Sequence, residues 1–175
     1  MEALVTGNET ENGKAQVAGI QYMVGDATAP PRDKPGIIVH VCNDIGAWGK
    51  GFVLALSRRW KQPEQRFRAW SNGEDVLPYA LGQVQFVPVE ENLVVANLIG
   101  QHGIRRQGGL PPVRYEAIEQ GLRRVAEQAQ ASGATVHMPR IACGLAGGTW
   151  DKIEPLIQVE LVAKGISVMV YDFPD

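Results

Sequence analysis

Hydrophobic positions along this chain recur at two spacings, one typical of strands and one typical of helices. Short apolar runs predict strands over residues 19–24, 36–41, 84–89, 93–99, 135–138 and 167–171. Apolar side chains that recur every three or four residues predict helices over 52–60, 63–70, 113–131 and 150–164. The run at 36–41, GIIVHV, is almost wholly apolar, so it predicts a central strand that is buried on both faces.

This alternation of strands and helices predicts an α/β domain with a mixed, mostly parallel sheet. The runs 84–89 and 93–99 are separated by a short polar turn, which predicts an antiparallel pair within that sheet. Residues 1–17 are mostly polar and predict a flexible leader, so we expect the folded domain to span residues 18–175. A chain of 175 residues is long enough for one domain with a sizeable core.

Composition and charge exclude several classes of protein. Apolar residues make up 45% of the chain, and its net charge of −2 provides no bulk attraction to nucleic acid or to a membrane. No apolar run is long enough to span a membrane, and the N-terminus lacks the apolar core of a signal peptide. We therefore expect a cytoplasmic protein with no membrane partner.

The two cysteines, Cys42 and Cys143, each lie within an apolar run of small residues. Two cysteines cannot form a zinc site alone, and we expect His40 and Cys42 to point to opposite faces of their strand. The sequence therefore predicts no metal site and no cofactor. Buried free thiols in a reducing compartment are the expected state of both cysteines.

A glycine-rich loop at residues 142–149 carries the strongest functional signal. It follows a predicted strand, contains Gly144, Gly147 and Gly148, and precedes a helix that begins near Trp150. Glycines let the backbone turn and expose its N–H groups, and a helix N-terminus favours anions, phosphate above all. The segment matches neither the P-loop nor the Rossmann fingerprint, so phosphate would be held in another way.

A second loop of this kind, NDIGAWGKG at residues 43–51, follows the buried strand. Its glycines allow a ligand to approach the backbone, and the Asn43 amide suits a pair of sugar hydroxyls. The alternative is that the glycines only permit the turn and that Asn43 caps it. Two such loops could clamp a diphosphate, and Asp26 could then accept a hydrogen bond from an exocyclic amine such as that of adenine. The alternative for Asp26 is a turn or helix-cap aspartate.

These segments resemble the macro domain family. The resemblance rests on VGD at residues 24–26, on Asn43 with WGKG at 48–51, and on MPRIACGL at 138–145 followed by Trp150. The chain is most similar to the branch of terminal ADP-ribose protein glycohydrolases, DNA ADP-ribosyl antitoxin macro domains and yeast-type ADP-ribose-1″-phosphate phosphatases. The resemblance implies a three-layer α/β/α fold that binds ADP-ribose in a cleft at the strand ends.

The resemblance also implies which residues bind the ligand. Asp26 matches the aspartate that binds the adenine amine, with Ala27 contributing backbone and Phe173 lying near the adenine ring, while Asn43 lies near the distal ribose. The first phosphate and ribose loop comprises Gly49, Lys50 and Gly51. The second loop holds the diphosphate through its N–H groups, and the residues assigned to it are Ile141, Gly144, Leu145, Ala146, Gly147 and Gly148.

The chain departs from this branch at the catalytic positions. The branch has a lysine where this chain has Gln101, and an acidic residue where it has Ala146. The lysine–aspartate covalent mechanism is therefore not available in that form. The candidates for a different arrangement are His102 as an acid–base group, Asp44 as a base and Gln101 as a group that orients water. A surface histidine and a loop-capping aspartate are the alternative interpretations.

The resemblance and these candidates together predict an enzyme that hydrolyses mono-ADP-ribose from an acceptor. We expect a glutamate or aspartate ester of a protein, because a carboxylate leaving group needs the least acid assistance, and a DNA base is the second acceptor considered. Arg105 and Arg106 are the candidates for contact with a phosphate backbone. Two alternatives stay open, a non-catalytic reader of ADP-ribose and an ADP-ribose-1″-phosphate phosphatase.

Overall fold

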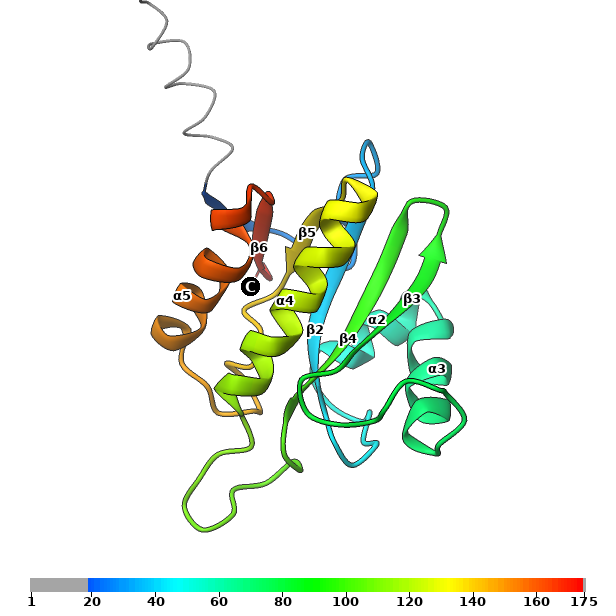
Figure 1. Ribbon diagram of the computed structural model, residues 1–175, viewed down its shortest axis with the longest axis vertical. Helices are drawn as coiled ribbons and strands as arrows, with labels where there is room; N and C mark the ends of the chain where they lie inside the picture. The colour runs from blue at the N-terminus through cyan, green and yellow to red at the C-terminus, as the bar shows by residue number, and fades with distance from the viewer. Residues whose placement is uncertain (1–18, 175) are drawn as a thin grey trace, which may run out of the picture.

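The computed structural model describes residues 19–174, which form a six-stranded sheet with helices on both faces (Figure 1). The predicted leader, residues 1–17, lies outside the described residues. In chain order the elements are β1 (Ile20–Val24), β2 (Gly36–Asn43), α2 (Phe52–Arg59), α3 (Gln62–Ser71), β3 (Val84–Glu90), β4 (Leu93–Gln101), α4 (Tyr115–Ser132), β5 (Thr135–Met138), α5 (Trp150–Glu160), the 3₁₀ helix η1 (Val162–Lys164) and β6 (Val168–Asp172). The predicted helix 150–164 is thus an α-helix that ends earlier, followed by a 3₁₀ turn.

The strands lie in the order β1-β6-β5-β2-β4-β3. All neighbours are parallel except β3 and β4, so the predicted antiparallel pair and the mostly parallel sheet are both confirmed. β2 lies inside the sheet and is buried along nearly its whole length, as its apolar sequence predicts. Because five strands are parallel, their carboxyl ends meet at one edge of the sheet, where the long loops gather at the bottom of Figure 1.

Helices α4 and α5 cover one face of the sheet, and α2 and α3 cover the other (Figure 1). Each face has its own buried core, with Ile118 and Ile153 on the α4–α5 side and Phe67 and Trp70 on the α2–α3 side. Burial of these apolar faces is what fixes the helices against the sheet. The three-layer α/β/α fold that the resemblance implies is confirmed.

A row of buried polar side chains crosses three strands. His40 on β2 donates from Nε2 to Asn97 Oδ1 on β4 over 2.5 Å, and Asn97 Nδ2 donates to Gln85 Oε1 on β3 over 3.0 Å. Asn97 also donates to the carbonyl of Pro63, and Gln85 donates to the carbonyl of Arg66, which ties α3 to the sheet. Burial lowers the pKa of His40 to about 4, so its ring is neutral at pH 7. His40 is therefore a core residue of the fold.

Candidate functional site

Every residue predicted for the site lies in a segment at the carboxyl edge of the sheet. Asp26 follows β1, Phe173 follows β6, loop 139–149 follows β5, loop 43–51 follows β2, and Gln101 ends β4. Neighbouring strands are about 4.8 Å apart, so the row from β1 to β4 spans about 19 Å. An elongated ligand placed along this edge would meet a different loop at each of its parts.

The centre of this row is the point where the chain connections diverge. The connection after β2 leads through α2 and α3 to β3 on one side, and the connection after β5 leads through α5 to β6 on the other. Adjacent parallel strands whose connections leave in opposite directions open a crevice between their loops, and ligands of α/β sheets bind in such crevices. The two glycine-rich loops adjoin there, since a β-carbon added to Gly51 would lie 3.5 Å from Leu145 Cδ1.

Loop 142–149 presents a row of free amide donors. The N–H of Gly147 donates to Gly144 O over 3.1 Å, and that of Gly148 donates to Ala142 O over 2.8 Å, so the loop folds back on itself. Within residues 19–174, the N–H groups of residues 143–146 have no hydrogen-bond partner. Consecutive unpaired N–H groups beside the N-terminus of a helix are donors that suit an anion.

The shape of this loop depends on its small residues. Ala142 has φ of 63°, a left-handed conformation that costs free energy for any residue with a side chain. A β-carbon on Gly148 would lie 2.6 Å from the Ala142 carbonyl oxygen, closer than such atoms approach. Glycine at position 148 is therefore needed for the fold of the loop. This agrees with the turn that the glycine-rich sequence of residues 142–149 predicts.

Loop 43–51 is held by the side chain of Asn43. Its Oδ1 accepts from the N–H groups of Ile45 and Ala47, over 3.0 and 2.9 Å, and its Nδ2 donates to Ala47 O over 2.8 Å. The capping role that the sequence left open is thus present, and the predicted sugar contact of Asn43 stays a prediction. Beyond it, the N–H groups of residues 49–53 have no partner within the described residues and lie at the N-terminus of α2.

Asp44 and His102, which come from two different loops, form a hydrogen-bonded pair. His102 Nδ1 lies 2.7 Å from Asp44 Oδ2, and the N–H of Gly103 donates to Asp44 Oδ1 over 2.8 Å. Burial raises the pKa of Asp44, but the hydrogen bonds from Gly103 and His102 outweigh it, so the pKa lies below the usual value. Asp44 is therefore an anion at neutral pH, and it is 18% exposed while His102 is 49% exposed.

The third catalytic candidate, Gln101, contacts the same segment. Its Nε2 donates to Gly103 O over 3.1 Å, and its backbone forms a bridge with Val113. Its role in orienting water stays a prediction. Gln101 also holds the backbone of Asp44, because its carbonyl accepts a hydrogen bond from the N–H of Asp44 over 3.1 Å.

At the other end of the row, the side chain of Asp26 forms hydrogen bonds within its own turn. It accepts from the N–H and the hydroxyl of Thr28, over 2.9 and 2.8 Å, and pairs with Arg59 over 3.4 Å. Burial raises its pKa, and these contacts together bring the pKa below the usual value. The predicted adenine contact stays a prediction, as does that of Phe173, whose side chain is exposed at the end of β6. Three other predicted residues have buried side chains, so only their backbone could meet a ligand: Ala27, Ile141 and Ala146.

The expectation that His40 and Cys42 point to opposite faces of their strand is wrong. Residues two apart on a strand share a face, and Cys42 Sγ lies 3.7 Å from His40 Nε2. Cys42 is buried as expected, whereas Cys143 is only partly buried.

Among residues 19–174, no group of three His, Cys, Asp or Glu side chains could hold a metal ion. No helix in the same range has the length and apolar character needed to cross a membrane.

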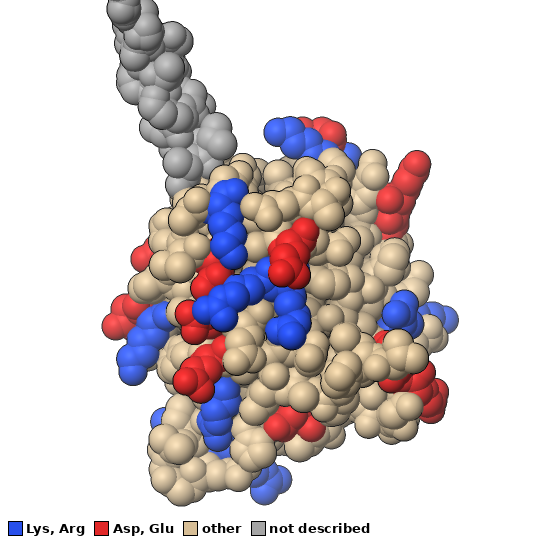
Figure 2. Space-filling view, in the orientation of Figure 1, with Lys and Arg blue, Asp and Glu red and all other residues tan. Residues whose placement is uncertain are grey.

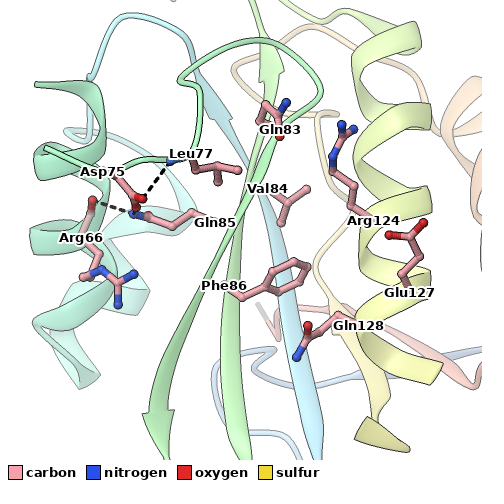
Figure 3. A pocket seen from close by; sticks show the side chains of 10 residues that line it. All are labelled: Arg66, Asp75, Leu77, Gln83, Val84, Gln85, Phe86, Arg124, Glu127 and Gln128. Atoms are coloured by element: carbon pink, nitrogen blue, oxygen red, sulfur yellow. Dashed lines mark hydrogen bonds between the residues drawn. The ribbon is translucent and has the colours of Figure 1, made fainter. Parts of the chain in front are cut away.

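A separate hollow of about 530 Å³ lies away from these loops, along β3 between α3 and α4 (Figure 3). Arg66 and Arg124 line it together with Asp75 and Glu127. Asp75 accepts from Gln85 Nε2 over 3.2 Å, so part of its polar lining is already paired within the protein. None of the predicted site residues lines this hollow.

Comparison with known proteins identifies the family. No protein-family model matches the chain. A solved structure of a macrodomain protein from Streptomyces coelicolor is 55% identical, with 88% of this chain and 99% of that chain covered and a TM-score of 0.79. The chain belongs to the macro domain family. A protein of unknown function from Bacteroides thetaiotaomicron is also 55% identical, over 88% of this macro domain and 98% of that chain, with a TM-score of 0.85.

More distant relatives carry functional names of their own. Chromodomain-helicase-DNA-binding protein 1-like from Mus musculus is 31% identical over 89% of this chain, and the macro domain spans only 18% of that protein's length. ADP-ribose 1″-phosphate phosphatase from Candida albicans is 23% identical over 79% of this chain and 92% of that protein. Thermosipho africanus DarTG, solved in complex with ADP-ribose, is 19% identical to this chain, with a TM-score of 0.61. The match covers 79% of this chain and 38% of that one, and at this identity the likeness shows the fold alone.

Proposed function

We propose that this macro domain binds ADP-ribose along the carboxyl edge of its sheet and hydrolyses the bond between mono-ADP-ribose and an acceptor. The observation that carries the proposal is that the two glycine-rich loops adjoin where the connections after β2 and β5 diverge. There the unpaired N–H groups of residues 143–146 adjoin the N-terminus of α2, whose first N–H groups are also unpaired. A diphosphate, with anionic oxygens on two linked phosphorus atoms, suits two facing sets of amide donors.

The order of the loops supports one orientation of the ligand. With the diphosphate between β5 and β2, adenine would extend towards Asp26 and Phe173, at the ends of β1 and β6. The distal ribose would then extend towards the ends of β2 and β4, where Asp44 and His102 lie. Titratable side chains at the end that holds the anomeric carbon favour a hydrolase over a pure binding module.

The acceptor we propose is a carboxylate ester on a protein glutamate or aspartate, with a DNA base as the second candidate. The name of the Candida albicans relative, ADP-ribose 1″-phosphate phosphatase, refers to chemistry at the same 1″ position. On the α4–α5 face, Lys and Arg side chains lie beside Asp and Glu and form no continuous patch of one sign (Figure 2). That face therefore offers no broad attraction to a nucleic acid, which favours the protein acceptor.

A second candidate function is a reader that binds ADP-ribose without cleaving it. The observation that favours it is the pair of replacements at the catalytic positions of the related branch, where this chain has Gln101 and Ala146. Ala146 is buried and its carbonyl accepts from the N–H of Val113, so this position has a structural role here.

The test uses the purified full chain. Calorimetry with ADP-ribose measures binding, and mass spectrometry follows the release of ADP-ribose from a glutamate-linked ADP-ribosyl peptide. Binding with release supports the hydrolase, and binding without release from any acceptor leaves the reader. Phosphate release from ADP-ribose-1″-phosphate would favour a phosphatase instead, and absence of binding would overturn the proposal as a whole.

A variant with its matched control tests the diphosphate site. Gly147→Glu places a carboxylate in the loop that carries the free amides, so we expect ADP-ribose binding to be lost in calorimetry. Gly147 has φ of 79°, so any side chain also strains the backbone there. Gly165→Glu is the control, because Gly165 has φ of 82° and open space around it, and it lies after η1 rather than at the site. Retained affinity in Gly147→Glu would contradict the diphosphate role.

A further inference from the structure

We infer that Asp44 and His102 form a general-base pair, in which His102 accepts a proton from the attacking water and Asp44 positions the ring, and that this pair suits the carboxylate leaving group of the proposed substrate. The inference rests on the proposed function and specifies which residues activate the water. Asp44 and His102 are far apart in the sequence, and the pairing of β2 with β4 brings them together.

The hydrogen bonds around Asp44 determine which ring nitrogen of His102 is free. Asp44 is held as an anion and lies 2.7 Å from Nδ1, so Nδ1 carries the proton and donates it to Oδ2. In the neutral ring, Nε2 is then the basic nitrogen, and it has no partner within residues 19–174. A fixed tautomer with an exposed basic nitrogen is the state that a general base requires.

Asp44 itself is held in place from two sides. Its Oδ1 accepts from the N–H of Gly103, and its own N–H donates to the carbonyl of Gln101. Both partners belong to the segment that carries His102, so the carboxylate and the ring are attached to one short stretch of chain. The Asp44 side chain is also mostly buried, which limits its freedom to turn away.

The other two histidines of the chain lack these properties. His137 uses both ring nitrogens, with Nδ1 2.8 Å from Tyr171 Oη and Nε2 2.8 Å from Thr135 Oγ1, and it is buried. His40 is buried and bonds to an amide rather than to a carboxylate. Only His102 combines a carboxylate partner with an exposed ring.

The chemistry that this pair supports follows from its single free nitrogen. Water attacks the anomeric carbon C1″ as the bond from C1″ to the acceptor oxygen breaks, through an oxocarbenium-like state. The water proton moves to His102 Nε2 and then to solvent, and the bonding electron pair leaves on the acceptor carboxylate. A carboxylate leaves without being protonated, whereas an alkoxide from a serine ether needs a second proton donor. The pair therefore favours acceptors linked through glutamate or aspartate.

The experiment compares two peptides of one sequence that carry ADP-ribose on a glutamate or on a serine. We expect the full-length chain to release ADP-ribose from the glutamate peptide at least about 100-fold faster, which is the smaller end of the usual contribution of acid–base catalysis. In H₂¹⁸O the label is expected in ADP-ribose and not in the glutamate carboxylate.

Two variants separate the base from the residue that positions it. His102→Asn is expected to lower kcat by about 10²–10⁴, with ADP-ribose affinity unchanged. Asp44→Asn lets the new amide donate to Nδ1, so the ring proton moves to Nε2 and kcat falls, while KM changes by less than about twofold. Asp44→Glu is expected to restore part of kcat. The matched control is Asp33→Asn, an exposed position in the loop before β2, which should leave kcat unchanged.

The outcomes distinguish this inference from the function on which it rests. Normal kcat in His102→Asn overturns the base pair and leaves the hydrolase standing. Equal rates on the two peptides, or ¹⁸O in the glutamate carboxylate, overturn the assigned leaving group or the attack at C1″. If the wild type binds ADP-ribose and releases none from either peptide, the proposed hydrolase is overturned and the role of the pair with it.

Discussion

Loop 142–149 and the Asp44–His102 pair lie at the same edge of the sheet but offer a ligand opposite kinds of groups. The loop offers backbone N–H donors, and its only ionisable side chain is that of Cys143, whose pKa is raised by burial. The pair offers two ionisable side chains from different loops, joined over 2.7 Å. The free N–H groups of loop 142–149 and the side chains of Asp44 and His102 belong to different segments, so we expect mutations in loop 142–149 to change affinity and mutations of the pair to change turnover.

The two regions should also differ in the kind of mutation to which they are sensitive. A site made of backbone donors depends on the path of the chain and on the absence of β-carbons at its glycines. A site made of two side chains depends on their chemical identity and tolerates changes elsewhere in its loops. The predictions below use this difference, beginning with the largest expected effect.

The first prediction separates charge from shape in the loop. Gly144 has open space where a β-carbon would stand, so Gly144→Ala should bind ADP-ribose within about threefold of the wild type. Gly144→Glu adds a carboxylate beside the free amides and should weaken binding by more than about 100-fold, because like charges repel strongly in a partly enclosed site. Calorimetry on both variants measures the effect. An equal loss in the alanine variant would mean that shape and not charge controls this position.

The second prediction concerns the path of the chain. A β-carbon on Gly148 would lie 2.6 Å from Ala142 O, so Gly148→Ala must displace the loop, and we expect the affinity for ADP-ribose to fall about tenfold. The kcat measured at saturating substrate should change little, because Asp44 and His102 lie in other loops. Titration calorimetry and steady-state kinetics test this together, with Gly144→Ala as the matched control. A large loss of kcat at saturation would show that the two regions are coupled.

The third and smallest effect concerns stability and its dependence on pH. The pKa of Asp44 is lower in the folded protein, so its contribution to stability is present above the unfolded-state pKa of about 3.9 and is lost as the pH falls through the folded-state pKa. Asp44→Asn should therefore lower the free energy of unfolding by about 1 kcal/mol at pH 7 and by less at pH 3. Urea unfolding at both pH values provides the measurement. A difference that stays constant with pH would show that the charge of Asp44 contributes nothing.

Much of the fold could be predicted from local sequence, and the reason is physical. The apolar run at β2 indicates burial on both faces, and the spacing in α4 indicates one buried stripe, because side-chain direction follows from backbone geometry. By the same rule His40 and Cys42, which are two residues apart on β2, share a face. The loop glycines were also recognisable, since Gly51 and Gly147 adopt positive φ, a conformation that other residues rarely adopt.

The site residues were predicted less completely, because polar side chains can serve either a ligand or their own loop. Asn43 caps its turn with both polar atoms of its amide, and Asp26 bonds to Thr28 and Arg59. Nothing in the sequence distinguishes these states from ligand contacts, since the same oxygen accepts either bond. The buried row through Asn97 and Gln85 was missed altogether, although two amide residues within largely apolar strands are a recognisable signal.

Local sequence thus specified the strands, the helices and the two glycine-rich loops, because backbone preference and the period of apolar side chains act over a few residues. Only the tertiary structure decided that the two loops adjoin and that Asp44 meets His102. These residues are 58 positions apart, and their contact requires β2 to pair with β4 in one register. Strand order depends on how all the apolar faces are buried together, which no single segment encodes.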